Sequence, residues 1–395
     1  MREEKSLLIK LGSSGSLKLA KWMPGSKMEG LVSSDEFNEQ IALEKFEHLA
    51  TQLKSHLYDR HADFNSQFDE TYITEYGEIN IAGNKVKPSQ ILFYFYNDEY
   101  KQQMKMSLEE RFNEILSLET NEDRINDLIQ LVKNKRVVPF VGAGLTVSCG
   151  MPTWTSFLND QATENELDLE MFKSLISKGH YENCADLLLE QMTGPRFNER
   201  YKHSFTLRQS VVGPIKYLPT IFTNGVITTN FDEVLEKTYA LKSRPLDAIT
   251  DDWMTHVKKG NNFIYKIHGT IEGTANRVLT KNEYDSKYGE NGSVNLERVL
   301  PKFLRACTES FSLMFVGCSL TSDRTFQTLK KINSDFGMTT THFAILQKPE
   351  DRAKRNQREK ELVEANIFPI WFEAERYEQV ELILNYIKLK FEGIL

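Results

Sequence analysis

The stretch that decides the fold is Val137-Val-Pro-Phe-Val-Gly-Ala-Gly-Leu-Thr146. Its apolar first half predicts a buried strand, and Gly142-Ala143-Gly144 predicts a tight turn after it. Such a turn brings backbone N–H groups close to a diphosphate at the start of the next helix, although a tight turn in any α/β protein has the same pattern. The full G-x-G-x-x-G fingerprint is absent because Val147 replaces its third glycine, which disfavours an ordinary dehydrogenase.

Further short apolar segments follow, and helical patterns separate them. They are Val226–Thr228, Phe263–Ile267, Leu313–Val316, Phe343–Leu346 and Ile367–Phe372. Strands that alternate with helices predict an α/β fold with a Rossmann-like, mostly parallel sheet. About 80 residues separate the first two strands, far more than one crossover needs. Helical periodicity in Phe157–Lys178 and His180–Met192 predicts a helical insert at about 155–215.

Residues 1–106 predict a smaller N-terminal α/β accessory region without a catalytic motif. A helical pattern covers Asp35 to Tyr58, and Tyr72 to Ile81 alternates loosely before the turn residues Gly83-Asn84. The aromatic stretch Ile91–Tyr96 predicts a strand. The region is either a plain accessory domain or an oligomer or partner interface, because an aromatic edge strand invites pairing.

Residues 107–395 form the predicted catalytic domain. Ser107 with Glu110 fits a capping box at the start of a helix, and the apolar spacing of Asn121–Lys133 predicts a second helix. The charge-rich stretch Lys348–Glu364 is most simply a solvated helix face.

Composition limits the classes of function. The chain has 395 residues and a net charge of −7, which disfavours broad contact with nucleic acid or an anionic membrane. Its four cysteines contain no CxxC pair, so neither a zinc ribbon nor a disulfide framework is expected. We expect no metal site, no transmembrane segment and no signal peptide, and therefore a cytoplasmic protein.

Polar residues follow the predicted strands where open α/β sheets bind ligands. Thr229, Asn230 and Asp232 follow Val226–Thr228, and the asparagine or aspartate could equally cap a helix. His268 ends the next strand, directly before a glycine, where it could accept a proton from water or a ribose hydroxyl. A lone histidine is also often structural.

The strand Leu313–Val316 is followed by another group of this kind. Gly317 and Ser319 could bond a ribose or phosphate, although Ser319 could instead be a helix cap. Cys318 is read as a small filler, because no histidine is near it in sequence. Further pocket candidates, for which ordinary packing or capping is the alternative, are Tyr284, Tyr288 and Asp323, with Gln347 as a possible adenine contact.

The four motifs in this order resemble the sirtuin superfamily of NAD-consuming enzymes over about residues 130–372. The resemblance implies that Gly142, Ala143 and Gly144 bind the diphosphate, with Thr146 as a helper. It implies that Asn230 and His268 are catalytic. The remaining cofactor-binding residues that it implies are Thr229, Asp232, Gly317, Ser319 and Asp323.

Two departures narrow the resemblance. The paired CxxC zinc module of protein-deacylating sirtuins is absent, and Thr153-Trp154-Thr155 stands where those enzymes have Asp-Phe-Arg. Both features, with Leu279 to Tyr288, resemble the bacterial sirtuin-like NADases of anti-phage defence. The resemblance implies that NAD⁺ is a substrate cleaved to nicotinamide and ADP-ribose, with a cyclic product not excluded. It also implies a homo-oligomer and a HerA-like ATPase as a possible partner.

Two other functions remain open at this point. A protein deacylase or ADP-ribosyltransferase would consume NAD only when an acceptor is added, and the missing zinc module counts against it. A non-catalytic module that senses NAD or ADP-ribose would bind without turnover. Release of nicotinamide from NAD by the protein alone distinguishes these readings.

Overall fold

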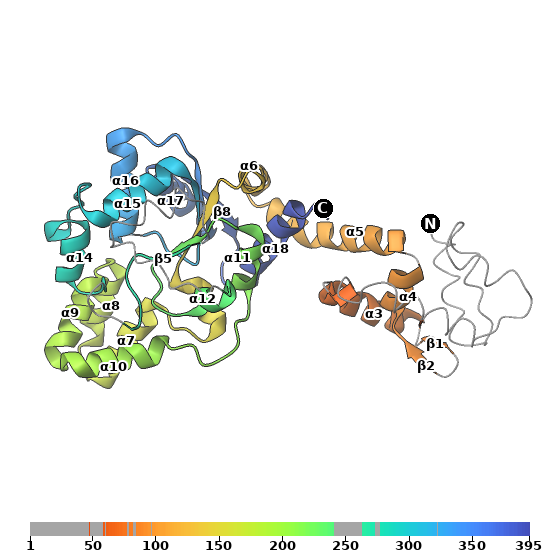
Figure 1. The fold of residues 1–395 in the computed structure, drawn as a ribbon, viewed down its shortest axis with the longest axis horizontal. Helices are drawn as coiled ribbons and strands as arrows, with labels where there is room; N and C mark the ends of the chain where they lie inside the picture. Colours follow the sequence, from red (N-terminus) through yellow and green to blue (C-terminus); the bar gives the residue numbers. More distant parts are fainter. Residues whose placement is uncertain are drawn as a thin grey trace, which may run out of the picture. The chain divides into compact units, whose positions relative to one another are not determined.

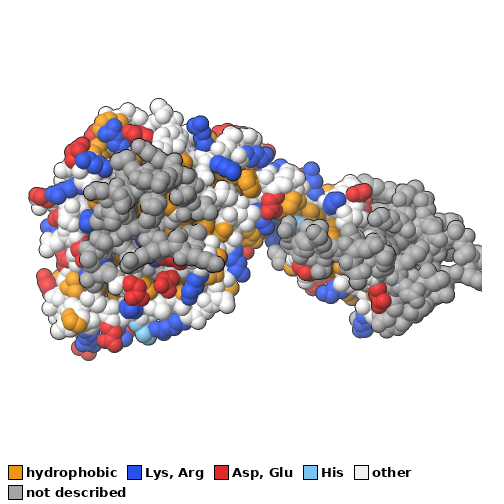
Figure 2. All heavy atoms as spheres, in the orientation of Figure 1, with side chains coloured by type: hydrophobic (Ala, Val, Ile, Leu, Met, Phe, Trp, Pro, Cys, Tyr) orange, Lys and Arg blue, Asp and Glu red, His pale blue; other side chains and the backbone are white. Residues whose placement is uncertain are grey.

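The computed structural model divides the chain into two compact units, Met1–Arg111 and Phe112–Leu395, and each is described by itself. The structure describes residues 47, 58–59, 61–76, 79–81, 84–95, 97–240, 263–272, 277–321 and 323–395. Figure 1 draws the second unit as a sheet with helices on both sides. Figure 2 shows both signs of charge interspersed over the viewed face of this unit, rather than one large field of a single sign.

The described part of the first unit is mostly helical. It contains α3 (Ala62–Tyr76), a hairpin of β1 (Ile79–Ile81) and β2 (Asn84–Val86), α4 (Pro88–Phe95) and most of α5 (Asn97–Leu116). β1 and β2 pair antiparallel, with Ile79 opposite Val86. Aromatic rings form the core of this unit; Phe93 and Tyr100, for example, lie 5.1 Å apart between centroids.

Two predictions for this region are wrong. Ile91–Tyr96 is not a strand, because residues up to Phe95 belong to α4. Pro88 favours a helix start, and Ile91 to Tyr94 are all buried, so this short apolar run belongs to a buried helix, which periodicity alone cannot separate from a strand. Ser107 starts no helix, because α5 runs through it without interruption. The helix predicted from Asp35 to Tyr58 lies almost wholly outside the described residues.

The second unit is built on a six-stranded, fully parallel sheet of order β5-β4-β3-β6-β7-β8. The strands are β3 (Val137–Val141), β4 (Val226–Thr228), β5 (Ile264–Lys266), β6 (Ser312–Val316), β7 (His342–Gln347) and β8 (Ile367–Phe372). The predicted Rossmann-like sheet is confirmed. The chain leaves β3 toward β4 on one side and later returns as β6 on the other, so the topological switch point lies between β3 and β6.

Helices cover both faces of this sheet (Figure 1). On one face, α6 (Asn121–Lys133) packs on β3 and β8, and α18 (Glu378–Phe391) packs on α6. On the other face, α15 (Val299–Ser310), α16 (Arg324–Phe336) and α17 (Arg352–Val363) share one apolar core with the strands. Its rings include Phe140 and Phe315, which lie 5.0 Å apart between centroids. The predictions of helix Asn121–Lys133 and of a helix within Lys348–Glu364 are confirmed.

Four of the helices between β3 and β4 form the expected insert. They are α7 (Trp154–Glu164), α8 (Leu169–Ser177), α9 (Tyr181–Gln191) and α10 (Gly194–Phe205). The single pattern over Phe157–Lys178 is divided into two helices, because Asp168 caps a new start by accepting from the N–H groups of Glu170 and Met171. The insert has a hydrophobic core of its own, which also contains Phe231 from the loop after β4.

Candidate functional site

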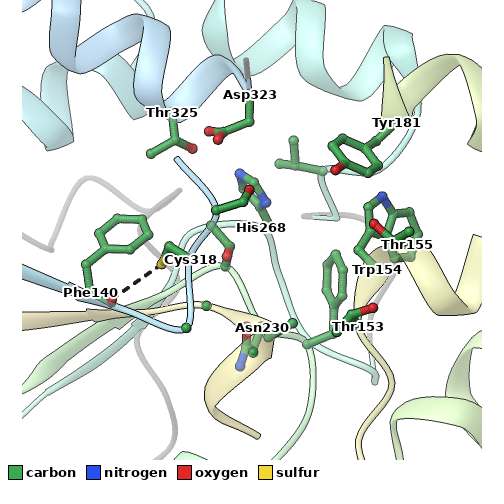
Figure 3. Close-up of a pocket in the computed structure, with 18 of the residues that line it drawn as sticks. Phe140, Thr153, Trp154, Thr155, Tyr181, Asn230, His268, Cys318, Asp323 and Thr325 are labelled. Carbon is green, nitrogen blue, oxygen red and sulfur yellow. Dashed lines mark hydrogen bonds between the residues drawn. The ribbon is translucent and has the colours of Figure 1, made fainter. Parts of the chain in front are cut away.

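One cavity of about 370 Å³ lies at the carboxyl ends of the central strands, within the size range of small-molecule sites, about 300–1,000 Å³. Figure 3 shows side chains from strand ends and from the insert facing it. Ten of the predicted site residues line it: Gly142, Ala143, Gly144, Thr229, Asn230, Asp232, His268, Gly317, Ser319 and Asp323. Tyr284 also lines it, whereas Thr146, Tyr288 and Gln347 do not.

The glycines after β3 and β6 bring two backbone segments into direct contact. A Cβ on Gly142 would lie 2.4 Å from the carbonyl oxygen of Gly317, and one on Gly317 would lie 2.3 Å from the N atom of Leu145. The N–H groups of Gly142 and Gly144 donate to Val316 and Gly317 at 2.9 Å. Both N–H groups are therefore engaged within the fold, and a diphosphate would have to meet other donors of the cavity.

The loop after β4 holds its polar side chains in a small hydrogen-bonded group. Asn230 Nδ2 donates to Thr146 Oγ1 at 3.4 Å, and that hydroxyl lies 3.3 Å from Asp232 Oδ2. Asp232 Oδ1 also accepts from the N–H of Val234, the first residue of α12 (Val234–Thr238), although the N-cap position of that helix is Glu233. Asn230 Oδ1 is buried and has no partner among the described residues, which leaves it free for a ligand. Thr146 thus supports this loop from behind the cavity.

Lys266, which the sequence reasoning missed, fixes the same loop. Its ammonium is 2% exposed and donates to the carbonyl oxygens of Phe231, at 3.0 Å, and of Asp232. It also pairs with Glu236 at 2.9 Å. A buried charge persists only with such partners. The signal in the sequence was a lysine inside the otherwise apolar segment Phe263–Ile267.

His268 lies at the end of β5, and its ring is held by buried hydroxyl groups. Its Nε2 lies 2.8 Å from the hydroxyl of Tyr288, which lies 3.0 Å from Oγ1 of Thr325. Burial lowers the pKa of His268 to about 3, so the imidazole is neutral near pH 7. Gly269 follows with φ +93°, a conformation that glycine readily adopts.

The loop after β6 completes the sheet side of the cavity. Arg358 from α17 donates to the carbonyl oxygens of Ser319, at 2.7 Å, and Leu320, at 2.8 Å. Asp323 caps α16, because its carboxylate accepts from the N–H of Phe326. The residue that caps this helix is therefore Asp323 and not Ser319. Burial raises the pKa of the Cys318 thiol, which fits a packing residue.

The insert supplies an aromatic wall that the sequence did not reveal as part of the site. Trp154, Tyr181 and Phe205 line the cavity together with Phe231; Trp154 and Tyr181 are labelled in Figure 3. The Trp154 and Phe231 rings lie 5.9 Å apart between centroids. Flat apolar rings beside polar strand ends suit a ligand that has both a ring and hydroxyl groups.

A buried cation ties the insert to the sheet. Arg324, at the start of α16, pairs with Glu182 of α9 at 2.6 Å and with Asp285 of α14 (Lys281–Tyr288) at 2.7 Å. Its Nη1 also donates to the carbonyl oxygen of Gly289 at 2.7 Å. Since Tyr181 precedes Glu182, this cluster fixes one rim of the cavity.

Charge around the cavity is sparse. The ionisable carboxyls of its lining are Asp232 and Asp323, and burial raises the pKa of each. Neither lysine nor arginine is among the described lining residues. Within the same described ranges, no group of three or more His, Cys, Asp or Glu side chains is placed to hold a metal ion. All four cysteines are free thiols, and no helix among the described residues is long and apolar enough to cross a membrane.

Taken together, a parallel sheet with a cavity at its switch point defines the class of Rossmann-like α/β proteins. Comparison with known families makes this more specific. Residues 224–370, from just before β4 into β8, match the SIR2-like domain. This matched segment contains Asn230, His268 and Gly317, three of the residues on which the predicted resemblance rests.

Known relatives are similar over a longer stretch. The chain is 26% identical over 231 residues to the NAD(+) hydrolase ThsA of Bacillus cereus (strain MSX-D12), which is 58% of this chain and 46% of that protein. It is 28% identical over 220 residues to the NAD(+) hydrolase ThsA of Enterococcus faecium, 53% of this chain and 42% of that protein. The chain thus matches less than half the length of these curated relatives.

Proposed function

We propose that this protein is an NAD⁺ hydrolase that cleaves the bond between nicotinamide and ribose, giving nicotinamide and ADP-ribose. The observation that carries the proposal is that Gly142, Asn230, His268 and Gly317, predicted from separate motifs, line one cavity at the switch point. The SIR2-like domain and the NAD(+) hydrolase relatives support the same substrate and reaction.

The chemistry required of the protein is modest. Nicotinamide leaves as a neutral ring from a pyridinium, through an oxocarbenium-like transition state, so no strong acid is needed. Asn230 has an unsatisfied buried carbonyl oxygen, which can orient a water or a ribose hydroxyl. His268 is neutral, so its free nitrogen can accept a proton from that group.

Nicotinamide release from NAD by the full-length protein tests the function. Purified protein is incubated with NAD over protein concentrations from nanomolar to tens of micromolar, and products are separated by chromatography. His268→Ala and Asn230→Ala are each expected to lower the rate by about 10²–10⁴-fold. His203→Ala, an exposed histidine of the insert, is the control and should leave the rate unchanged. Two site variants with native rates would refute the assignment.

We propose that the biological role is defence, in which NAD depletion in the cytoplasm stops phage growth together with the infected cell (abortive infection). This part rests on the resemblance to bacterial sirtuin-like defence NADases. Such an activity has to be latent, so we propose that assembly controls it, through the region 1–106 as an oligomer interface and with a HerA-like ATPase as a partner. Gel filtration with activity measurement tests this: a strict monomer that is fully active at nanomolar concentration would contradict it.

A further inference from the structure

The loop after β6 contains a leucine in a backbone conformation that favours glycine. Leu320 has φ +50°, in the left-handed region, where a residue with a side chain is disfavoured about 5–30-fold. Its side chain is 2% exposed and packs in the core that the strands share with α15, α16 and α17. Leu320 and Ser319 both line the cavity. A strained residue of this kind persists only because its surroundings hold it in place.

Arg358 of α17 holds this leucine from both sides. Its Nη2 donates to the carbonyl oxygen of Ser319 at 2.7 Å and to that of Leu320 at 2.8 Å. These carbonyl groups belong to the peptide units directly before and after the Cα atom of Leu320. Within the described ranges, no backbone–backbone hydrogen bond involves Ser319 or Leu320. One guanidinium therefore fixes the two peptide planes that set φ and ψ of Leu320.

The surroundings of Arg358 fit this role better than that of an ordinary ion pair. Its side chain is 18% exposed, and Glu361 lies 3.5 Å away, farther than either carbonyl oxygen. Burial lowers the pKa of Arg358, because the charged form loses hydration. The ring centroid of Phe326 lies 5.7 Å from its Cζ atom, close enough for a cation–π contact. Among the described residues, the shortest contacts of this cation are those to the loop.

The same two bonds set the direction of the backbone N–H groups. In a trans peptide unit the N–H points opposite to the C=O, and no described peptide bond is cis. Both carbonyl oxygens are turned toward Arg358, which does not line the cavity, so the N–H groups of Leu320 and Thr321 are turned away from it. Without Arg358 either peptide unit could rotate, and the polar groups along this part of the cavity would change.

We propose that Arg358 is a positioning residue for NAD⁺, which keeps the loop Gly317–Leu320 in the conformation that receives the nucleotide. This inference rests on the proposed function. Arg358 acts through two carbonyl groups and does not itself line the cavity. The nucleotide binds only the molecules in which the loop has this conformation, so the apparent affinity falls in proportion to their fraction. Loss of Arg358 therefore weakens binding and leaves the chemical step in the bound complex unchanged.

The test compares two arginines of the same helix in the full-length protein. Arg358→Met removes the charge and both bonds, whereas Arg358→Lys keeps the charge but carries its nitrogen one bond short of Nη2. Arg355→Met is the matched control, because Arg355 is 15% exposed, pairs with Glu119 at 3.1 Å and does not line the cavity. Melting temperature, kcat and KM for NAD, and the Kd for ADP-ribose from calorimetry are measured for each protein.

Arg358→Met and Arg358→Lys are both expected to raise KM for NAD and Kd for ADP-ribose about 5–30-fold, the factor by which a left-handed leucine is disfavoured. Their kcat should stay within about threefold of native, because the interaction is lost equally in the ground state and the transition state. Arg355→Met should leave KM and Kd within about twofold of native, because its partner is Glu119 rather than the loop.

Each outcome decides the inference. A lower melting temperature of Arg358→Met with native KM and Kd would make the role purely structural and refute the proposal, while the hydrolase function stands. Native constants in Arg358→Lys would show that only the charge matters, which also refutes it, and this variant decides alone if Arg358→Met unfolds.

The two proposals fail in different ways. A native protein that binds ADP-ribose but releases no nicotinamide refutes the hydrolase function, and the Kd values then decide the role of Arg358. A native protein that neither releases nicotinamide nor binds ADP-ribose refutes both.

Discussion

Replacing Gly317 with alanine tests the contact between the loops after β3 and β6. An added Cβ would lie 2.3 Å from the N atom of Leu145 and 2.8 Å from the carbonyl oxygen of Gly142. Both neighbours are backbone atoms, so neither can move aside without shifting a strand end. Gly317 also has φ +72°, in the left-handed region.

The expected loss in the free energy of unfolding has two parts, and a second glycine of the same chain serves as the control that separates them. A left-handed alanine costs about 1–2 kcal/mol, and overpacking against fixed atoms adds about 1–3 kcal/mol. Gly292, between α14 and α15, has nearly the same φ, +75°, but nothing lies within 4 Å of an added Cβ. Gly292→Ala should therefore lose only the first part, and Gly317→Ala about 2–5 kcal/mol in total.

Urea unfolding of the native protein and both variants, followed by circular dichroism, measures the difference. The free energy of unfolding of Gly317→Ala should be about 1–3 kcal/mol lower than that of Gly292→Ala. Nicotinamide release should also be lost in Gly317→Ala alone, because the loops after β3 and β6, which line the cavity, are pushed apart. Equal stability of the two variants would show that the loops have room to separate, and the steric reasoning would fail.

Three further perturbations have defined outcomes. Burial lowers the pKa of His342 to about 4, so the unfolded chain binds the extra proton below pH 6.5, and His342 alone should lower the free energy of unfolding by about 2 kcal/mol from pH 7 to 5, in addition to the contribution of His268. A His342→Gln variant whose urea midpoints vary with pH as much as those of the native protein would contradict this. Lys266→Met should lower the free energy of unfolding, measured in urea, by about 3–5 kcal/mol, because a buried carboxylate and the loop after β4 lose their partner. It should also lower kcat at least tenfold; an unchanged kcat would mean that the loop keeps its conformation without Lys266. Glu182→Gln should lower the free energy of unfolding by about 2 kcal/mol, because Arg324 loses a charged partner. The exposed Glu170→Gln should change it by under about 0.5 kcal/mol; equal effects would show that the pair of Arg324 and Glu182 does not stabilise the fold.

The sheet could be predicted because each strand is short, almost wholly buried and followed by a small or polar residue or ended by one. Val137–Val141 and Val226–Thr228 agree with the structure residue for residue. The two failures in the first unit have different causes. Ile91–Tyr96 is apolar on every side, so no period distinguishes strand from helix. Ser107 fits a capping box but lies inside α5, because tertiary packing extends that helix through a locally plausible start.

The candidate site was predictable where residues follow strands, since the ends of parallel strands meet at one edge. It was not predictable where partners come from separate helices. Thr325 and Tyr181 reach the cavity from α16 and α9, and no spacing in the sequence relates them to His268. Thr146 shows a different limit: its position after the glycine turn was read correctly, but its side chain turns back toward Asn230.

The position of Phe231 couples two parts of the second unit mechanically. This ring is packed in the core of the insert, 5.1 Å from Tyr201 between centroids, although it belongs to the loop after β4. Asn230 is its neighbour in the chain. Phe231 is bound on the other side to the sheet, because Lys266 of β5 donates to its carbonyl oxygen. Asn230 therefore stands beside the residue at which the core of the insert and the edge of the sheet meet, and a change in either one would be transmitted to this asparagine.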